Sequence, residues 1–243
     1  MSILLAVLAI LLGGVMKGAI GAGVPVIAAP ALTMLFNVQT AVVILVVPNL
    51  LSNIWQAWQF RAQAMPRRFL VLFAGGGMLG VAVGTWVLAV LPQESLSLLV
   101  ALAVIAYIGL RLAKPGWTLA RDTANRLCGP AGVVGGFLQG ATGISAPASI
   151  TFLNAMKLPR EAFIGTISIF FVAMTAMQIP ALWSVGLLSM EKLALGFGAL
   201  GLVFLSMPLG NWLGKRASPK VFDIIMLGTL GAIAIKIVIE TVF

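Results

Sequence analysis

The chain alternates between long apolar blocks and short clusters of basic residues. Most of the blocks are long enough to cross about 30 Å of hydrocarbon as a helix, and the stretch from Gly18 to Phe60 contains no charged residue at all. This pattern predicts an all-α polytopic membrane protein. Its apolar blocks occupy residues 3–36, 38–60, 69–91, 96–112, 127–156, 162–183, 193–213 and 221–243.

Two of these blocks, 3–36 and 127–156, are too long for one straight transmembrane helix. The first contains Gly-Ala-Ile-Gly-Ala-Gly-Val-Pro, which ends at Pro25, and the second contains Gly-Ala-Thr-Gly-Ile-Ser-Ala-Pro, which ends at Pro147. Helices tend to break at glycine and proline. We therefore expect each block to form a hairpin of two short helices that meet near the membrane centre. Close helix packing by small residues is the alternative explanation of the glycines.

The two interrupted blocks resemble each other at an offset of 122 residues, which places Gly18 opposite Gly140 and Pro25 opposite Pro147. The chain is therefore predicted to be an internal duplication. Each half has one hairpin and three crossings, and an odd unit that is repeated in sequence must be inverted. The first repeat is 1–112, with hairpin 3–36 and helices 38–60, 69–91 and 96–112; a cytoplasmic linker spans 113–126; the second repeat is 127–243, with hairpin 127–156 and helices 162–183, 193–213 and 221–243.

Basic residues determine the expected orientation in the membrane. If the block 127–156 returns to the side where it started, all loops that contain several basic residues share one side, and Lys192 alone lies on the other. The positive-inside rule places those loops in the cytoplasm. This predicts a multi-pass protein of the inner (plasma) membrane with cytoplasmic basic loops and both termini outside.

Composition restricts the function to the membrane itself. Of the 243 residues, 61% are apolar and 9% are charged, and the mean hydropathy is +1.12, which leaves no room for a soluble domain. The net charge of +9 comes from loop residues, so nucleic-acid binding is not expected. The chain has no histidine and only one cysteine, Cys128. Because the blocks also lack paired carboxylates, metal ligands and an activated nucleophile, we expect neither an enzyme nor a cofactor.

Lys17 is the first candidate site residue, because it lies just before the first glycine-rich break. It is about 21 Å along a helix from Ile3 at 1.5 Å per residue, and a cation at that depth usually marks a ligand or ion path. Its counterpart in the second half, Gln139, is neutral. A helix that begins at each break would also present free N–H groups and a partial positive charge to the gap. Together these features predict an anion site.

Polar residues on two other segments extend this candidate site. Asn49, Asn53 and Gln56 fall on one helix face, and Ser168, Thr175 and Gln178 repeat the arrangement in the other half. Interhelical hydrogen bonding without a role in binding is the alternative for each of them. The complete predicted substrate-binding set is Lys17, Gly21, Ala22, Gly23, Val24, Asn49, Asn53, Gln56, Gln139, Thr142, Gly143, Ser145, Ala146, Thr175 and Gln178.

The acidic residues all fall in loops or near a terminus, so the apolar blocks offer no carboxylate or histidine for a proton relay. We therefore expect transport that does not depend on a buried protonatable group of this kind. An anion that leaves a cell with a negative interior gains about 2.3 kcal/mol per charge per 100 mV, which is enough to drive export. Sodium bound by backbone carbonyls at a broken helix stays open as a coupling ion.

The motifs of the chain resemble those of a known family. The duplicated glycine-proline segments, Phe60-Arg61 at the end of the second block, and Ala162 with Gly165-Thr166 after the second hairpin are similar to the sulfite exporter TauE/SafE family of bacterial membrane proteins. The resemblance covers nearly the whole chain. It implies export or exchange of sulfite or small organosulfonates, with the hairpin tips as the site.

The chain departs from the family's glycine run at Val24-Pro25 in the first half and at Ser145-Ala146 in the second. These changes alter which backbone amides face the gap, so they bear on the substrate. The resulting hypothesis is a secondary carrier that exports a small oxyanion by alternating access around two hairpins. An anion channel and a membrane scaffold subunit without transport activity are the alternatives. The expected partners are the small anionic substrate and the lipid bilayer, and the sequence leaves a homodimer open.

Overall fold

A computed structural model describes residues 2–113, 116–216, 224 and 227–232 of the chain. The part of the chain that it describes is all-α, without strands. Its helices are α1 (Ser2–Ile20), α2 (Val24–Leu35), α3 (Val38–Phe60), α4 (Arg67–Val90), α5 (Gln93–Ala113), α6 (Arg121–Thr142), α7 (Ser149–Ala155), α8 (Arg160–Ser184) and α9 (Met190–Gly214).

The first long apolar block is broken where the glycines predicted it. Helix α1 ends at Ile20, and Gly21 follows with φ 79°, a left-handed conformation that favours glycine. Helix α2 then begins at Val24, with Pro25 in its first turn, where a missing N–H costs no helical hydrogen bond. A methyl group on Gly23 would lie 2.9 Å from Lys17 N, so the start of α2 lies directly against the end of α1.

The second long block is also broken, but its two arms are unequal. Helix α6 ends at Thr142, and Gly143 caps it in the left-handed conformation with φ 75°. The following turn extends to residue 148, and the return helix α7 has only 7 residues. Helix α6 starts at Arg121, so the end of the segment 113–126, which we interpreted as a linker, is already helical.

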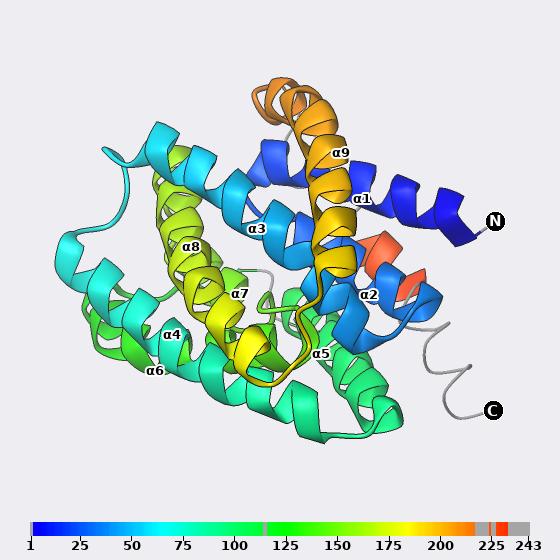
Figure 1. Cartoon of the computed structure of the whole chain (residues 1–243). Coiled ribbons are helices and arrows are strands. Elements are labelled where there is room, and N and C mark those ends of the chain that lie inside the picture. Colours follow the sequence, from blue (N-terminus) through cyan, green and yellow to red (C-terminus); the bar gives the residue numbers. More distant parts are fainter. Residues whose placement is uncertain (1, 114–115, 217–223, 225–226, 233–243) are drawn as a thin grey trace.

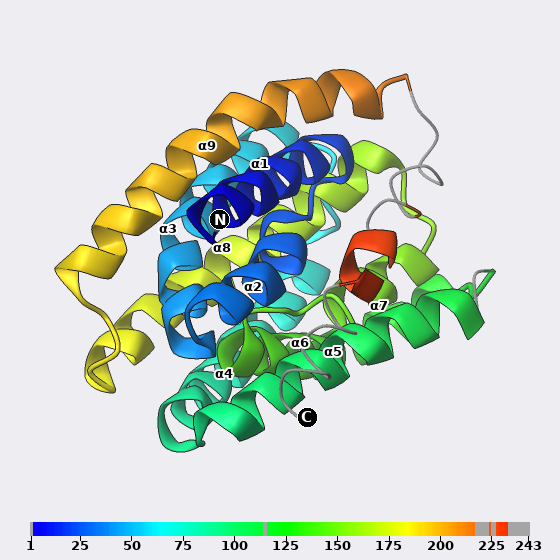
Figure 2. The ribbon, with the colours of Figure 1, turned by 90° about the vertical axis from the view of Figure 1, so that its right-hand side faces the viewer.

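The helices form three groups that are visible in two perpendicular views. Helices α1 and α9 lie on one side, α4, α5 and α6 lie on the other, and the two central helices α3 and α8 pass between them, with the short helix α2 beside α3 (Figures 1 and 2). The two central helices are therefore enclosed by neighbours, and they provide much of the buried core, which includes Val43, Ile44, Phe170 and Phe171. Polar groups in the middle of these two helices, such as Asn53 and Thr175, are consequently kept away from the outer surface.

Glycines allow very close contact within two parallel helix pairs. A methyl group on Gly76, Gly80 or Gly84 of α4 would collide with the backbone of Gly129, Val133 or Phe137 of α6, in the same order along both helices. The same relation holds for α1 and α9, where a methyl group on Gly14 would meet the backbone of Val203, one on Gly18 would meet that of Met207, and ones on Gly210 and Gly214 would meet those of Val15 and Ala19. Each pair joins a broken hairpin to a helix of the other half.

Helices α3 and α8 run in opposite directions along each other. Ser168 Oγ lies 3.3 Å from Gln56 Oε1, and Asn49 Nδ2 lies 3.0 Å from Thr175 Oγ1, so the residue numbers decrease on α3 as they increase on α8. Inverted halves would produce an antiparallel central pair with a parallel pair on each side, each parallel pair combining one helix from either half. The inverted relation itself stays a prediction.

Six described helices are long and apolar enough to cross a membrane: α1, α3, α4, α5, α8 and α9. Large apolar side chains such as Leu79, Phe197 and Leu205 are 60–74% exposed on their outer faces, as expected where a helix faces lipid. Helix α2 is apolar but shorter. The predicted helix 221–243 lies largely outside the described residues.

The glycine contacts between α4 and α6 lead to a stability prediction. Gly80→Ala places its methyl group against Val133 O, whereas Gly75→Ala on the same helix meets nothing within 4 Å. We expect Gly80→Ala to destabilise the protein by about 1–3 kcal/mol through overpacking, measured by thermal unfolding in detergent. Gly75→Ala should be neutral or slightly stabilising. Equal melting temperatures for the two variants would contradict the close helix contact.

Candidate functional site

Lys17 lies in the last turn of α1 and is 1% exposed. Its ammonium group donates a hydrogen bond to Asn53 Oδ1 at 2.6 Å and another to Gly21 O at 3.2 Å. The face of the Phe171 ring lies on another side, with its centroid 5.9 Å from Nζ, within the range of a cation–π contact. The cation is thus enclosed by α1, α3 and α8 and by the break that follows α1.

A continuous series of hydrogen bonds leads away from this ammonium group. Asn53 Nδ2 donates to Asn49 Oδ1 at 2.8 Å, Asn49 Nδ2 donates to Thr175 Oγ1 at 3.0 Å, and the Thr175 hydroxyl donates to Phe171 O at 2.8 Å. Asn49, Asn53 and Thr175 are each at most 2% exposed. Every oxygen in the series faces the donor nearer to Lys17, so the dipoles are aligned to stabilise a positive charge at its start.

Gln56 connects the same three helices beside this series. Its Nε2 donates to Lys17 O at 3.0 Å, and its Oε1 accepts from Ser168 Oγ at 3.3 Å. The structure therefore brings together five polar residues of the predicted site, and Ser168 joins them. They form what we call the Lys17 cluster: Lys17, Asn49, Asn53, Gln56, Ser168 and Thr175.

No carboxylate accompanies this buried cation in the described part of the chain. The four acidic residues there, Glu94, Asp122, Glu161 and Glu191, are all exposed, and none pairs with Lys17. Neutral oxygens alone accept from its ammonium group. Since burial of a charge is costly unless it is paired, the described residues leave a positive charge in the Lys17 cluster without a counter-charge.

The first break contributes backbone to this cluster in a selective way. Gly21 N–H donates to Lys17 O at 2.8 Å, so this amide closes α1 and is not free for a ligand. The residue that caps α2 is Gly23, which has no side chain to accept from the first turn, and the N–H groups of a first helical turn lack intrahelical partners. Ala22 and Val24 are 1% and 0% exposed, which leaves the start of α2, rather than Gly21, as the donor group of this break.

The polar residues of the second break satisfy one another locally. The Thr142 hydroxyl donates to Leu138 O at 2.7 Å, and the Ser149 hydroxyl lies 2.8 Å from Ser145 Oγ. Gly143 N–H donates to Gln139 O at 2.9 Å. Like Gly21, Gly143 therefore uses its own amide within the helix end, and Ala146 beyond it is fully buried.

This second break is packed against the first half of the chain. A methyl group on Gly143 would lie 3.3 Å from Ala29 Cβ on α2 and 3.2 Å from Val42 Cγ2 on α3. Gln139 Oε1 and Gln178 Nε2, both buried, have no hydrogen-bond partner among the residues that the structure describes. The second-half residues are thus near the centre of the fold, but no hydrogen bond joins Gln139, Thr142, Ser145 or Gln178 to the Lys17 cluster within the described ranges.

A partly open cavity of about 470 Å³ reaches the Lys17 cluster from one end of the bundle. Gln56, which donates to Lys17 O, and Gly18, which follows Lys17, both line it. Its other walls come from the last turns of α3 and α9: Trp55, Gln59, Phe60, Phe204, Met207, Pro208 and Asn211. The cavity therefore reaches the edge of the Lys17 cluster at Gln56, beside the end of α3 that precedes Arg61.

Arg160 also contacts this region, although the sequence indicated it only as one of the basic loop residues that set the orientation in the membrane. At the start of α8, its guanidinium group donates to Ala19 O and Gly18 O at 3.0 Å each and to Asn211 Oδ1 at 3.2 Å. A cation at the C-terminal end of a helix is favourable because the last carbonyls are unpaired. The only sequence signal was its position after Pro159, at the start of an apolar block.

These features define a multi-pass α-helical membrane protein with a buried, cationic polar site at a broken helix. The chain belongs to the sulfite exporter TauE/SafE family, whose model matches residues 6–237, nearly the whole chain. No curated protein and no solved structure matches it. The family membership confirms the resemblance that the glycine-proline segments indicated, and it identifies the class as membrane exporters.

The hydrogen bond between Lys17 and Asn53 leads to a prediction on stability. Asn53→Ala removes the closer of the two acceptors of the buried ammonium group and should cost about 1–3 kcal/mol of unfolding free energy. In a Lys17→Met background the same substitution should cost measurably less, with a coupling energy of about 0.5–3 kcal/mol. Denaturation of the four proteins in detergent would measure this. Additive effects would show that the two side chains do not interact.

Proposed function

We propose that this protein is a secondary carrier that exports a small oxyanion, such as sulfite or an organosulfonate, across the inner membrane. The observation that supports the proposal most directly is the buried Lys17 ammonium group, for which no described residue supplies a negative charge. An anion would provide that charge. Membership of a sulfite exporter family supports an oxyanion as the substrate class.

The Lys17 cluster has the donors that such a substrate requires. An ammonium group has three N–H bonds, and two of those of Lys17 have acceptors in the structure. The uncapped start of α2, which is packed against the backbone of Lys17, adds amide donors and the positive end of a helix dipole. Sulfite and sulfonate oxygens are acceptors only, so these groups complement them.

The cavity beside Gln56 supports an approach from the cytoplasm. It is lined by the end of α3, and the loop that follows α3 contains the basic residues that we expect to be cytoplasmic. An anion that enters there and leaves outside moves down the membrane potential, which provides about 2.3 kcal/mol per charge per 100 mV. Export therefore needs no coupling ion on energetic grounds.

The two breaks support a mechanism of alternating access between two halves. A methyl group on Gly21 would lie 2.6 Å from Ile164 Cγ1 on α8, and Gly143 lies against α2 and α3. Each break thus contacts helices of the other half, so a relative movement of the halves would change the surroundings of both. We propose that inverted repeats move in this way around the site.

The proposal predicts the behaviour of three variants in proteoliposomes. The wild type should transport labelled sulfite or small sulfonates in preference to sulfate and carboxylates. Lys17→Gln and Lys17→Ala should lower the apparent affinity at least about tenfold, because one charge-assisted hydrogen bond is worth about 1.5–3 kcal/mol. Asn53→Asp should do the same, since its carboxylate would neutralise Lys17 from within the protein.

The Asn53→Asp variant keeps a side chain of similar size, and its thermal unfolding in detergent serves as the control for folding. If Lys17→Ala transported with unchanged affinity, the role of Lys17 in binding would be wrong. Counterflow of labelled substrate distinguishes a carrier from a channel, which would instead give large currents without counterflow. A scaffold subunit would give no flux at all.

The route through the cavity leads to a separate prediction on accessibility. Met207 lines the cavity and is 7% exposed, whereas Leu205 on the same helix is 74% exposed and does not line it. In a Cys128→Ala background, Met207→Cys should react with a membrane-impermeant thiol reagent in inside-out vesicles, and substrate should slow the reaction. Leu205→Cys, which faces lipid, should stay unmodified. Modification of Met207→Cys only in right-side-out vesicles would contradict entry from the cytoplasm.

A further inference from the structure

A second cavity, of about 630 Å³, lies between the first turns of α4 and α6. Three arginines and a single carboxylate line it, together with one amide and apolar groups. The lining residues are Pro66, Arg68, Phe69, Leu72, Arg121, Asp122, Asn125 and Arg126. It shares no lining residue with the cavity beside Gln56. This basic cavity is therefore separate from the proposed transport site.

The charges of the basic cavity are not compensated within the described part of the protein. Asp122 forms no ion pair there with Arg68, Arg121 or Arg126, and Arg121 donates to the sulfur of Met65 at 4.0 Å. Three guanidinium groups against one carboxylate leave an excess of positive charge. Arginine pairs well with phosphate because its planar donors match two phosphate oxygens at once.

The backbone adds to this positive potential. Helices α4 and α6 are parallel, as the order of their glycine contacts shows, so both start at the basic cavity. Neither Pro66 nor Ala120, the residues that cap these helices, provides a side-chain acceptor for the first turn. Two helix N-termini and three arginines thus favour a bound anion at the same place.

The apolar part of the lining indicates that this anion belongs to a lipid headgroup and is not a free ion. Leu72 lies one helical turn beyond Arg68 and is 45% exposed, on the outer face of α4 that also contains Val71 and Leu79. Phe69 is 3% exposed and forms a buried apolar part of the lining. The basic cavity therefore continues into an apolar surface of the kind that faces acyl chains, as a phospholipid headgroup site requires.

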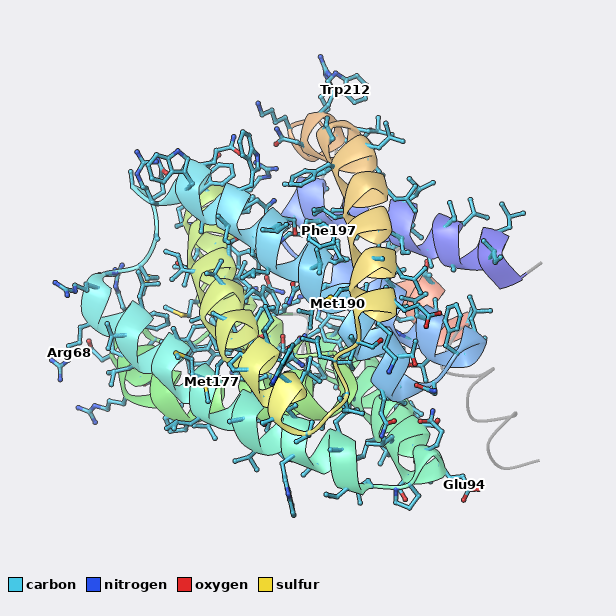
Figure 3. All side chains as sticks on the ribbon, viewed as in Figure 1. Arg68, Glu94, Met177, Met190, Phe197 and Trp212 are labelled. Atoms are coloured by element: carbon cyan, nitrogen blue, oxygen red, sulfur yellow. The ribbon has the colours of Figure 1, made fainter. Side chains whose placement is uncertain are left out.

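The close contact of α4 and α6 prevents this cavity from being an ion path. Beyond the first turns, Gly76 lies against Gly129 and Gly80 lies against Val133, too close for even a methyl group between them. The space between the two helices is thus closed toward the membrane centre. Figure 3 shows Arg68 at one end of α4 and Glu94 near the other, with Arg68 pointing away from the bundle.

We propose that the basic cavity is a binding site for an anionic phospholipid, whose phosphate contacts Arg68, Arg121 and Arg126 while its acyl chains follow the outer face of α4. Positively charged cavities between transmembrane helices are suited to such headgroups. The lipid would hold the starts of α4 and α6 together where the glycine contacts end. With the orientation expected from the basic loops, it belongs to the cytoplasmic leaflet.

The proposal is tested with purified full-length protein in detergent, by native mass spectrometry and thermal unfolding with added lipid. Phosphatidylglycerol should bind as a discrete adduct and raise the melting temperature more than phosphatidylcholine does. In the double variant Arg68→Gln/Arg126→Gln, phosphatidylglycerol should bind at least about tenfold more weakly, because each basic residue contributes about 1 kcal/mol near an anionic headgroup. Lipid-free melting temperatures show whether this variant is folded.

Arg67→Gln/Arg61→Gln is the matched control, because it removes the same charge from neighbouring residues that do not line the cavity. This control should keep the affinity and the thermal shift of the wild type. Equal losses in the two double variants would overturn the proposal in favour of diffuse attraction by the basic loops. Inorganic phosphate that reproduces the thermal shift at millimolar concentration would overturn the lipid as the occupant.

Discussion

The structure depends on the solvation of one buried cation by neutral dipoles. Lys17 lies at the end of α1, where a helix would normally continue, and its ammonium group replaces water with the oxygens of Asn53 and Gly21. The amides of Asn53 and Asn49 and the Thr175 hydroxyl are all oriented by this charge. These hydrogen bonds join α1, α3 and α8 at defined positions along each helix. A shift of one helix along another would break them.

Such a network stabilises a cation without neutralising it. A carboxylate beside Lys17 would form a stable ion pair and would remove the attraction for an external anion. Amide and hydroxyl oxygens lower the cost of burial but leave the net charge in place. The break after Ile20 adds to the same field, since the uncapped start of α2 directs its dipole toward the end of α1. Fold and charge are therefore coupled at a single point of the chain.

Much of this arrangement is local enough to be visible in the sequence. The two glycine-proline breaks follow from backbone preferences, and the shared face of Asn49, Asn53 and Gln56 follows from helical spacing. The cap that Arg160 forms on α1 joins residues 141 positions apart, and no local pattern contains such a contact. The sequence did not predict that α7 is short or that Gln139 and Gln178 lie apart from the Lys17 cluster. Both features depend on how the second hairpin packs against helices that are distant in the sequence.

The glycine contacts of α1 with α9 and of α4 with α6 have a consequence for how this fold can be divided. The glycine stripes of α1 and α4 in the first half pack against α9 and α6 of the second half. A fragment cut at the middle loop would leave both glycine stripes facing lipid, with no partner for its hairpin. The two halves are therefore expected to fold and insert into the membrane as one unit, and neither is expected to be stable when it is expressed alone.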